Sequence, residues 1–217
     1  MTQTQRDHII EMAMRMFVTQ GIKSVRMDDI AQEIGVSKRT LYEMFGDKEE
    51  LIYLCITRYL EALQKSIHQK AAGESHNMLE AILIGFFEMT KSSDTNNRIM
   101  GNLRKFYPTV YERIHRETGE KGSLRFKTAI ARCVDDGLLD RHVNIDLALT
   151  MLYYMAIGIV ARKDVMLPEG VSAREAFIHV VIMFFRGIST PEGMRIIDGF
   201  PKSELFGQYK RQLDNED

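Results

Sequence analysis

Residues 27–44 read MDDIAQEIGVSKRTLYEM, and this segment predicts the structure of the N-terminal part of the chain. A short helix over 27–34 is followed immediately by Gly35, the kind of residue that ends a helix in the left-handed conformation. Ser37 then stands as the N-cap of a second helix over 38–45. The sequence therefore predicts two helices joined by a three-residue turn.

The small and apolar residues of this stretch fall where two crossing helices need them. Ala31 lies where the first helix touches the second, because a larger side chain would push the crossing apart. The residues expected to fill the core between the helices are Ile30, Ile34, Val36, Leu41 and Met44. This pattern is typical of the helix-turn-helix motif, which places its second helix in the major groove of DNA. The alternative is a helical hairpin that meets these spacings by chance.

Burial of the apolar set leaves polar side chains facing outward at the start of the second helix. In such docking, the N-terminal residues of the recognition helix reach base edges, while flanking hydroxyl and cationic groups hold phosphates. We expect Arg39 to contact a guanine and Lys38 to contact a base or a phosphate. The full set predicted to contact DNA is Arg26, Lys38, Arg39, Thr40, Tyr42 and Lys48. The alternative is that these cations form an ordinary solvated face.

The balance of charge argues against binding through bulk positive charge. The whole chain has 29 Lys and Arg against 30 Asp and Glu, a formal net charge of -1. Residues 1–50 hold seven Lys and Arg against nine Asp and Glu, a net charge of -2. Affinity for double-stranded DNA must therefore come from a few well-placed contacts and from duplication of the site, with modest non-specific binding.

The N-terminal motifs resemble the TetR family of bacterial transcriptional regulators. The similarity is dense over the first fifty or so residues, and the order of a small head and a larger helical body agrees along the chain. The resemblance implies a homodimer whose two recognition helices enter successive major grooves, and a body that holds a small-molecule pocket. The motifs are Phe17-x3-Gly21, Asp29-Ile30-Ala31, Gly35-Val36-Ser37-Lys38-Arg39-Thr40-Leu41-Tyr42, Phe45 and Lys48-Glu49-x-Leu51.

Three positions depart from the family pattern. The family often has Thr as the cap where this chain has Arg26, and an aromatic residue or His where it has Glu43 and Met44. Met44 cannot donate a hydrogen bond to a phosphate as His would. Glu43 either accepts from a cytosine amino group, faces away, or pairs with Arg39.

The rest of the chain is predicted to be helical, so the fold class is all-α. The division expected is a three-helix helix-turn-helix head over 1–46, a connecting helix over 47–72, and a ligand-binding and dimerisation body over 73–217. Apolar periodicity and breakers predict loops at 92–96, 119–123 and 168–170, and a surface helix or frayed end at 203–217. Helices are predicted over 4–20, 27–34, 38–45, 47–72, 77–90, 97–106, 109–116, 124–138, 145–163 and 173–186.

The last two long helices are apolar around most of their circumference. A helix that is apolar on several faces must be covered on several faces, by its own body and by a second subunit. The resemblance places the family's dimer interface on the same two helices, whereas the alternative makes them central helices of a monomer. The predicted interface residues are Leu149, Tyr153, Ile157, Val160, Phe177, Val181 and Phe184.

A small-molecule effector is expected to bind an apolar pocket within the body. Met and aromatic side chains suit an adaptable pocket, with a Tyr hydroxyl to orient the ligand. The same side chains at helical spacing also form ordinary core, and this alternative stays open. The candidate pocket residues are Phe86, Met89, Met100, Leu103, Tyr107, Phe126, Ile130, Met151 and Tyr154.

Catalysis, cofactors and membranes find no support in the sequence. The six His residues are scattered, with no HExxH, no GxGxxG, no phosphate loop and no GxSxG motif. We therefore expect no enzyme activity, no cofactor, no metal and no catalytic residue. The two Cys residues form no CxxC pair, and no signal-peptide core or membrane-spanning stretch is present. We expect a cytoplasmic protein without a membrane partner.

The function predicted is that of a homodimeric repressor released from its operator by a small apolar ligand. One alternative keeps the DNA-binding head but makes the body a protein-interaction module without an inducer. The alternative from another class is a helical adaptor that never binds DNA.

Overall fold

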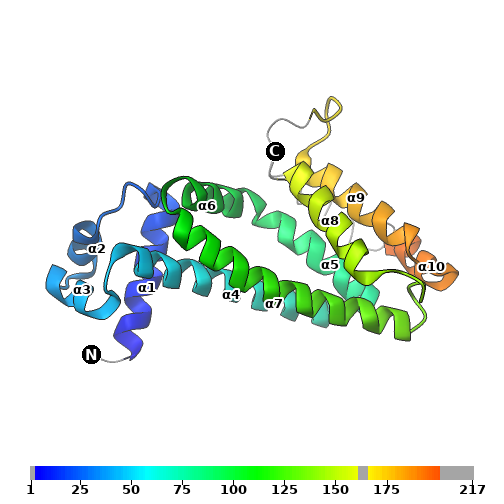
Figure 1. Ribbon diagram of the computed structural model, residues 1–217, viewed down its shortest axis with the longest axis horizontal. Coiled ribbons are helices and arrows are strands. Elements are labelled where there is room, and N and C mark those ends of the chain that lie inside the picture. Colours follow the sequence, from blue (N-terminus) through cyan, green and yellow to red (C-terminus); the bar gives the residue numbers. More distant parts are fainter. Residues whose placement is uncertain (1–2, 161–165, 201–217) are drawn as a thin grey trace. The chain divides into compact units, whose positions relative to one another are not determined.

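The computed structural model describes residues 3–160 and 166–200, except the side chains of 156–158 and 160. Every regular element among these residues is an α-helix, and the one β-type pairing described is an isolated bridge between Leu139 and Ser189. The all-α expectation is confirmed (Figure 1). The helices are α1 (Gln3–Gln20), α2 (Met27–Ile34), α3 (Lys38–Phe45), α4 (Lys48–Glu74), α5 (Met78–Lys91), α6 (Ser93–Phe106), α7 (Pro108–Asp135), α8 (Ile145–Val160), α9 (Ala173–Gly187) and α10 (Pro191–Gly199).

The chain divides into two compact units. Unit 1 comprises Met1–Ser66 and Asp94–Glu120, and unit 2 comprises Ile67–Ser93 and Lys121–Asp217. The long helices α4 and α7 each contribute residues to both units. These units reflect packing alone, and the functional division predicted at residues 46 and 72 stays a prediction.

Unit 1 has a core that extends well beyond the first three helices. Phe17 of α1, Ile30 of α2 and Leu41 of α3 are buried together with the apolar side of the first half of α4. Leu103 of α6 and Ile114 of α7 belong to the same core. The predicted head therefore packs on helices that come much later in the sequence.

Unit 2 is built around α9, which packs against α5, α8 and α10. Figure 1 shows α8 and α9 side by side. The core comprises Leu83 and Phe87 of α5, Val181 and Phe185 of α9, and Ile197 of α10. The burial of α9 on α5 decides which of its faces remains available to solvent.

The start of α10 is fixed by a close contact that only glycine allows. A Cβ atom added at Gly193 would lie 2.0 Å from the backbone oxygen of Leu138. The backbone N–H of Gly193 donates to Oγ1 of Thr190, the N-cap of α10, at 3.2 Å. The hydroxyl of Thr190 in turn donates to the carbonyl of Gly137 at 2.7 Å. The N-terminus of α10 is thus tied to the segment that follows α7.

We expect Gly193→Ala to destabilise the protein by at least about 1–3 kcal/mol, because the backbone must move to admit the methyl group. Thermal unfolding followed by circular dichroism measures the change. Gly101→Ala in α6 is the matched control, since nothing lies within 4 Å of its added Cβ. Ala lowers the cost of forming a helix relative to Gly, so this control should unfold at the same or a higher temperature. Equal melting temperatures for wild type and Gly193→Ala would refute the close contact.

Two predictions about the elements are wrong, and one helix was not predicted. Residues 119–123, predicted to be a loop, lie inside the continuous helix α7, because packing along the helix outweighs about 1 kcal/mol per interior glycine. The predicted loop at 92–96 is reduced to Ser92, since α6 begins at Ser93. Helix α10 is absent from the predicted helices. Residues 161–163 of a predicted helix and the segment 203–217 lie outside the described residues.

Candidate nucleic-acid interface

The turn between α2 and α3 has the predicted geometry. Gly35 adopts φ 73° and ψ 31°, the left-handed conformation that ends a helix. Its N–H bonds to the carbonyl of Gln32 at 3.3 Å, and the N–H of Val36 bonds to the carbonyl of Ala31 at 3.0 Å. Ser37 caps α3 by accepting from the N–H of Thr40 at 3.0 Å. These bonds satisfy groups at both helix ends, so the three-residue turn is rigidly specified.

The apolar face of the motif is buried as the sequence predicts. Ile30, Ala31 and Leu41 are buried in the core of unit 1, and so is Phe45. The other expected core residues, Ile34, Val36 and Met44, are half-buried and pack against that core. The burial turns the opposite side of α3 to solvent.

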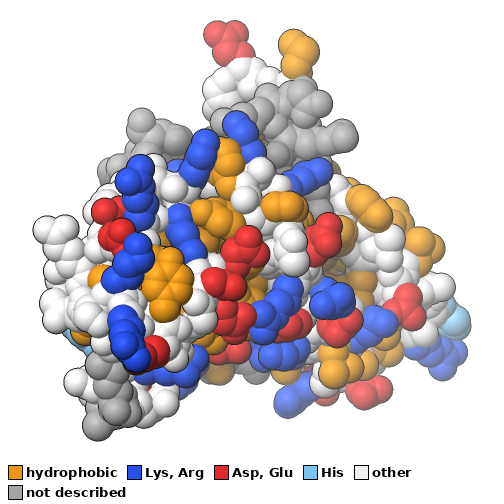
Figure 2. Space-filling model, turned by 60° about the vertical axis from the view of Figure 1, so that its left-hand side comes forward, with side chains coloured by type: hydrophobic (Ala, Val, Ile, Leu, Met, Phe, Trp, Pro, Cys, Tyr) orange, Lys and Arg blue, Asp and Glu red, His pale blue; other side chains and the backbone are white. Residues whose placement is uncertain are grey.

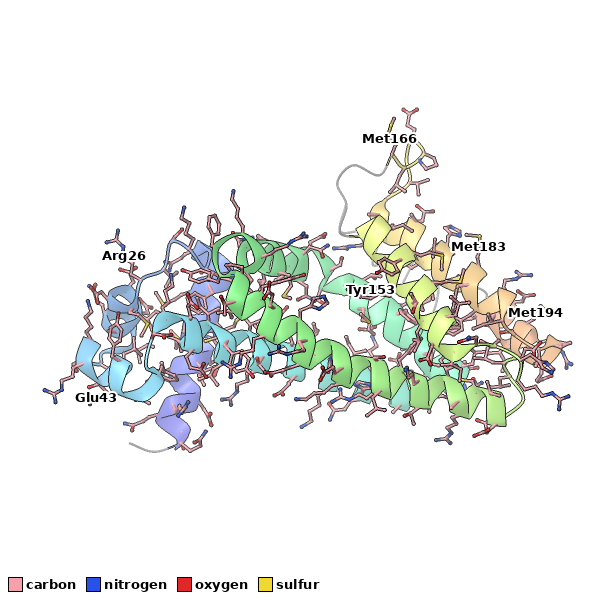
Figure 3. All side chains as sticks on the ribbon, viewed as in Figure 1. Arg26, Glu43, Tyr153, Met166, Met183 and Met194 are labelled. Atoms are coloured by element: carbon pink, nitrogen blue, oxygen red, sulfur yellow. The ribbon has the colours of Figure 1, made fainter. Side chains whose placement is uncertain are left out.

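Arg39 lies on the exposed side of α3, with 88% of its side chain accessible. Its Nε donates to Oε1 of Glu43 at 2.8 Å, one helical turn further along. Glu43 therefore pairs with Arg39 in the absence of DNA, and a contact between Glu43 and a cytosine amino group stays a prediction. An exposed pair of this spacing contributes only about 0.3–0.5 kcal/mol, so a base edge can displace it. Figure 3 shows Glu43 at the outer surface of this part of the molecule.

Lys38 connects the two helices of the motif. Its Nζ lies 2.8 Å from Oδ1 of Asp28, near the start of α2. The hydrogen bond from Lys38 to this carboxylate, followed by the charge of Asp28, raises the pKa of Lys38 above its usual value. The ammonium is therefore charged, and it must leave Asp28 or share it to contact DNA.

The two hydroxyl groups predicted to bind phosphates differ in exposure. Tyr42 is 41% exposed on the same side of α3 as Arg39 and Lys38. Thr40 is half-buried, and its Oγ1 lies 2.7 Å from Oγ of Ser37. A hydroxyl can donate once and accept twice, so Thr40 keeps capacity for a further bond.

Lys48 is directed toward the α1–α2 turn rather than along α3. Its Nζ donates to the carbonyl of Ile22 at 2.8 Å and lies 3.5 Å from that of Lys23. The same ammonium lies 5.3 Å from the ring centroid of Tyr107. An ammonium has three donors, and two of them face these carbonyls. The phosphate contact predicted for Lys48 stays a prediction.

The residues Asp47 and Glu50 have the spacing of a capping box at the start of α4, but the box forms only in part. Asp47 accepts from the N–H of Glu50 at 2.8 Å, as the cap requires. The carboxylate of Glu50 does not accept from the backbone N–H of Asp47, because it accepts a hydrogen bond from Arg113 of α7 at 2.8 Å instead. Tyr53 lies beneath the same guanidinium and donates to Glu117 at 2.6 Å. This network holds the first turns of α4 against α7.

Arg26 is the exposed N-cap of α2. Its backbone N–H donates to Oδ2 of Asp29 at 2.7 Å, while its guanidinium cannot accept a hydrogen bond from the helix. Figure 3 shows the side chain of Arg26 extending outward from the motif. The side chain is therefore open to an anion such as a phosphate.

The nine candidate pocket residues do not come together in one core. Phe86, Phe126 and Ile130 pack in the core of unit 2, where the ring centroids of Phe86 and Phe126 are 5.6 Å apart. Others belong to unit 1, where Leu103 is fully buried. Met100 and Tyr107 accompany Leu103, whereas Met89, Met151 and Tyr154 are exposed.

The predicted dimer interface needs a correction on α9. Phe177 and Val181 are buried inside unit 2, because their side of α9 packs against α5, so they are not available to a partner. Leu149 and Phe184 are half-buried and Tyr153 is exposed, whereas the side chains of Ile157 and Val160 lie outside the described residues. The exposed apolar residues on these helices are Leu147, Met151, Tyr153, Tyr154 and Met183.

The described residues hold no candidate metal site, no ionised thiol and no membrane-spanning helix. Among them, no group of three or more His, Cys, Asp and Glu is placed to hold a metal ion. Burial raises the pKa of Cys55 to about 12 and that of Cys133 to about 11, so both thiols stay protonated. None of the helices in the described ranges is long and apolar enough to cross a membrane.

Comparisons with known proteins match the motif and the fold. The family model described as bacterial regulatory proteins, tetR family, matches residues 9–53. The HTH-type transcriptional regulator AcrR of Shigella flexneri is 30% identical over 101 residues, 45% of this chain and 47% of that protein. The chain thus spans about half the length of this relative.

Solved structures extend the likeness to the remaining helices. A transcriptional regulator of the TetR/AcrR family from Thermobifida fusca is 26% identical with a TM-score of 0.62, covering 85% of this chain and 98% of that one. A regulator from Saccharomonospora viridis in complex with choline is 17% identical with a TM-score of 0.66, covering 87% and 100%. The buried turn and the outward side of α3 therefore lie in a fold that these regulators share, and residues 9–53 match the model of the TetR family of bacterial regulatory proteins.

Proposed function

We propose that the protein is a homodimeric DNA-binding transcriptional regulator that inserts α3 into the major groove of an operator. The observation that carries this function is the turn at Gly35, Val36 and Ser37. It fixes α3 with its apolar side buried and with Lys38, Arg39 and Tyr42 exposed along the opposite side. A recognition helix needs this division of its surface.

The carboxylates beside the cations make binding selective. Asp28 holds Lys38 and Glu43 holds Arg39, so a random stretch of phosphates must displace both pairs without any base contact in return. When Arg39 leaves Glu43 for a guanine, its guanidinium gains two hydrogen bonds to the base, and these compensate for the lost ion pair. Weak binding to arbitrary DNA and tighter binding to one site are the expected consequence.

Phosphate contacts are assigned to the residues around α3. Thr40 and Tyr42 offer hydroxyl groups, Arg26 offers an exposed guanidinium, and Lys48 has one donor beyond its two carbonyl contacts. Lys38 contacts either a base or a phosphate once it leaves Asp28. Such contacts fix the register of the protein on the duplex but carry no sequence information.

A second subunit is proposed to cover the exposed apolar residues of α8 and α9. Leu147, Met151 and Tyr154 follow one another at spacings of four and three, so they form a stripe along one side of α8, called the α8 stripe below. Met183 of α9 and Tyr153 of α8 are exposed as well, as Figure 3 shows. A two-fold contact through these residues is self-complementary and closes at two copies.

The regulator is further proposed to be a repressor that a small apolar molecule releases. Unit 2 is the proposed place for this ligand, because the rings of Phe86, Phe126, Phe177 and Phe185 make its interior aromatic, with centroids 5.6–6.5 Å apart. The similar regulator from S. viridis binds choline, so its fold accommodates a small ligand. A ligand that prefers the DNA-free arrangement by about 1–3 kcal/mol lowers operator occupancy several-fold or more.

A gel-shift assay with DNA from upstream of the protein's own gene tests this function. We expect a retarded complex that an unlabelled specific duplex competes away and that a scrambled duplex does not. Adding metabolite fractions should release the DNA if the body binds an inducer. Release by a protein fraction alone would instead support an interaction module, and no complex with any duplex would support a helical adaptor.

Thr40→Ala and Tyr42→Phe should each weaken binding to specific and scrambled duplexes about equally. Each change removes one donor to phosphate and leaves the base contacts in place, so affinity should fall by about 1 kcal/mol per subunit. Fluorescence anisotropy with both duplexes measures the two affinities. A loss confined to the specific duplex would show that the hydroxyl reads a base instead.

A further inference from the structure

A group of lysine side chains gathers on two aromatic rings at the corner between α6 and α7. Tyr107 precedes Pro108, which disfavours helical geometry at that residue, so α6 ends and α7 begins there. The Nζ atoms of Lys23 and Lys105 lie 4.6 Å and 5.2 Å from the ring centroid of Phe106. With Lys48 near the ring of Tyr107, ammonium groups from three separate elements converge on this corner.

These lysines differ from the cations of α3 in having no carboxylate partner. Lys38 and Arg39 are each within 2.8 Å of a carboxylate oxygen. Within the part of the chain that the structure describes, no ion pair involves Lys23, Arg26 or Lys105, and all three side chains are exposed. Cations that lie close together without an ion-pair partner repel one another, and an anion at this place relieves the repulsion.

The surface is continuous with the predicted DNA-binding residues. Lys23 lies in the same α1–α2 turn as Arg26, and Lys48 holds that turn through the carbonyl of Ile22. In the view of Figure 2, which brings this end of unit 1 forward, Lys and Arg side chains gather around an exposed apolar group. The lysines therefore lie next to a residue of the predicted DNA-binding set.

A helix-end effect accounts for only part of this arrangement. Cations are favoured in the last turn of a helix, and Lys105 lies in the last turn of α6. Lys23 belongs to a different element, far away in the sequence, yet it lies over the same ring. The dipole of α6 gives no reason for the approach of Lys23, which the attraction between a cation and the face of an aromatic ring accounts for.

We propose that Lys23 and Lys105, held on the ring of Phe106, bind the phosphate backbone of the DNA that flanks the bases read by α3. The proposal rests on the DNA-binding function stated above and extends its surface to residues outside the helix-turn-helix segment. Residues 1–50 alone carry a net charge of -2, and Lys105 adds a positive charge to the DNA-binding surface from outside that segment. Phosphate neutralisation by lysines releases counterions and is independent of sequence.

The test is the salt dependence of binding to a duplex that the wild-type protein selects from randomised DNA. The variant is Lys23→Gln with Lys105→Gln, which keeps a polar side chain at each position and removes the two charges. The logarithm of the affinity should fall less steeply with the logarithm of salt concentration, by about 0.9 for each phosphate that the variant no longer neutralises. Affinity should fall by the same factor for selected and scrambled duplexes.

The matched control removes the same charge far from the proposed surface. Lys65 of α4 and Lys121 of α7 are both exposed. At a rise of about 1.5 Å per residue, Lys65 lies about 25 Å along α4 from Lys48. Lys121 lies about 20 Å along α7 from Pro108. Lys65→Gln with Lys121→Gln should keep the wild-type slope. Circular dichroism checks folding, and Lys105→Gln alone provides a milder variant.

The outcomes separate the two levels of the proposal. If the wild type selects a duplex and the Lys23 and Lys105 variant keeps the slope and affinity of the control, this surface does not bind phosphates. If the wild type selects no duplex, the proposed function itself fails and this extension fails with it. A reduced slope in the variant but not in the control supports the extension.

Discussion

Met151→Glu is expected to leave the protein monomeric and to lower its affinity for the operator by about 10²–10⁴-fold. Met151 is 52% exposed in the middle of the α8 stripe, where Leu147 and Tyr154 flank it. In a two-fold contact the substitution brings two carboxylates together and removes both from water. The α8 stripe offers no cation to compensate for this desolvation and repulsion. The second head then no longer binds as part of the same molecule, so it contributes nothing to affinity.

Sedimentation equilibrium and gel-shift titration measure the two effects. Leu124→Glu is the matched control, because Leu124 is an exposed apolar residue of α7 with 68% of its surface accessible. The control should stay dimeric and bind DNA with wild-type affinity. If Met151→Glu forms a dimer as stable as the wild type, the interface lies elsewhere. If the variant is monomeric but binds DNA with full affinity, DNA recognition does not require a dimer.

Arg39→Ala is expected to relax base selection at one position of each half-site and to weaken specific binding. A bidentate contact between arginine and guanine contributes about 1–3 kcal/mol of discrimination, and a dimer loses two copies of it, about 2–6 kcal/mol in all. Breaking the ion pair between Arg39 and Glu43 costs little of this free energy, because both side chains are exposed and one helical turn apart. Affinity for scrambled DNA should change much less.

Arg15→Ala is the matched control for this experiment. Arg15 of α1 pairs with Glu11 at 2.8 Å, with the same four-residue spacing as Arg39 and Glu43 and similar exposure. The control therefore removes an equal charge and an equal pair from a helix that does not enter the groove. Unchanged base selection in Arg39→Ala, as measured against a panel of single-base variants, would remove Arg39 from base readout.

The motif was predictable because its determinants are local. Gly35 ends one helix and Ser37 begins the next through hydrogen bonds that span fewer than six residues. The buried side of α3 follows from its spacing of apolar residues, with Leu41 and Phe45 one turn apart. Features of this kind require no knowledge of the remainder of the chain.

The partners of the charged residues were not predictable, since they depend on tertiary contacts. Lys48 faces the carbonyl of Ile22 and the ring of Tyr107, which belong to the α1–α2 turn and to the corner after α6. Glu50 binds Arg113 of α7 rather than the cap of its own helix. A charge pattern along the sequence shows that such groups are polar, but not which groups they meet.

The choice of face on α9 was also beyond the sequence. Its apolar residues lie on several sides of the helix, so periodicity does not distinguish the side that packs on α5 from the side left open. Phe177 and Val181 proved to be core, whereas Met183 is exposed. Similarly, the glycines of 119–123 suggest a break in any isolated helix, and only packing within the fold keeps α7 continuous.

Selection of bound duplexes from a randomised pool measures whether two copies of α3 read DNA together. We expect an inverted repeat whose half-site centres lie about 10–10.5 base pairs, or a multiple of that distance, apart. Each half-site should contain a guanine whose enrichment disappears in Arg39→Ala. A pool that stays random after repeated rounds would show that α3 does not select a DNA sequence, and an enriched sequence that is identical for wild type and Arg39→Ala would show that Arg39 reads no base.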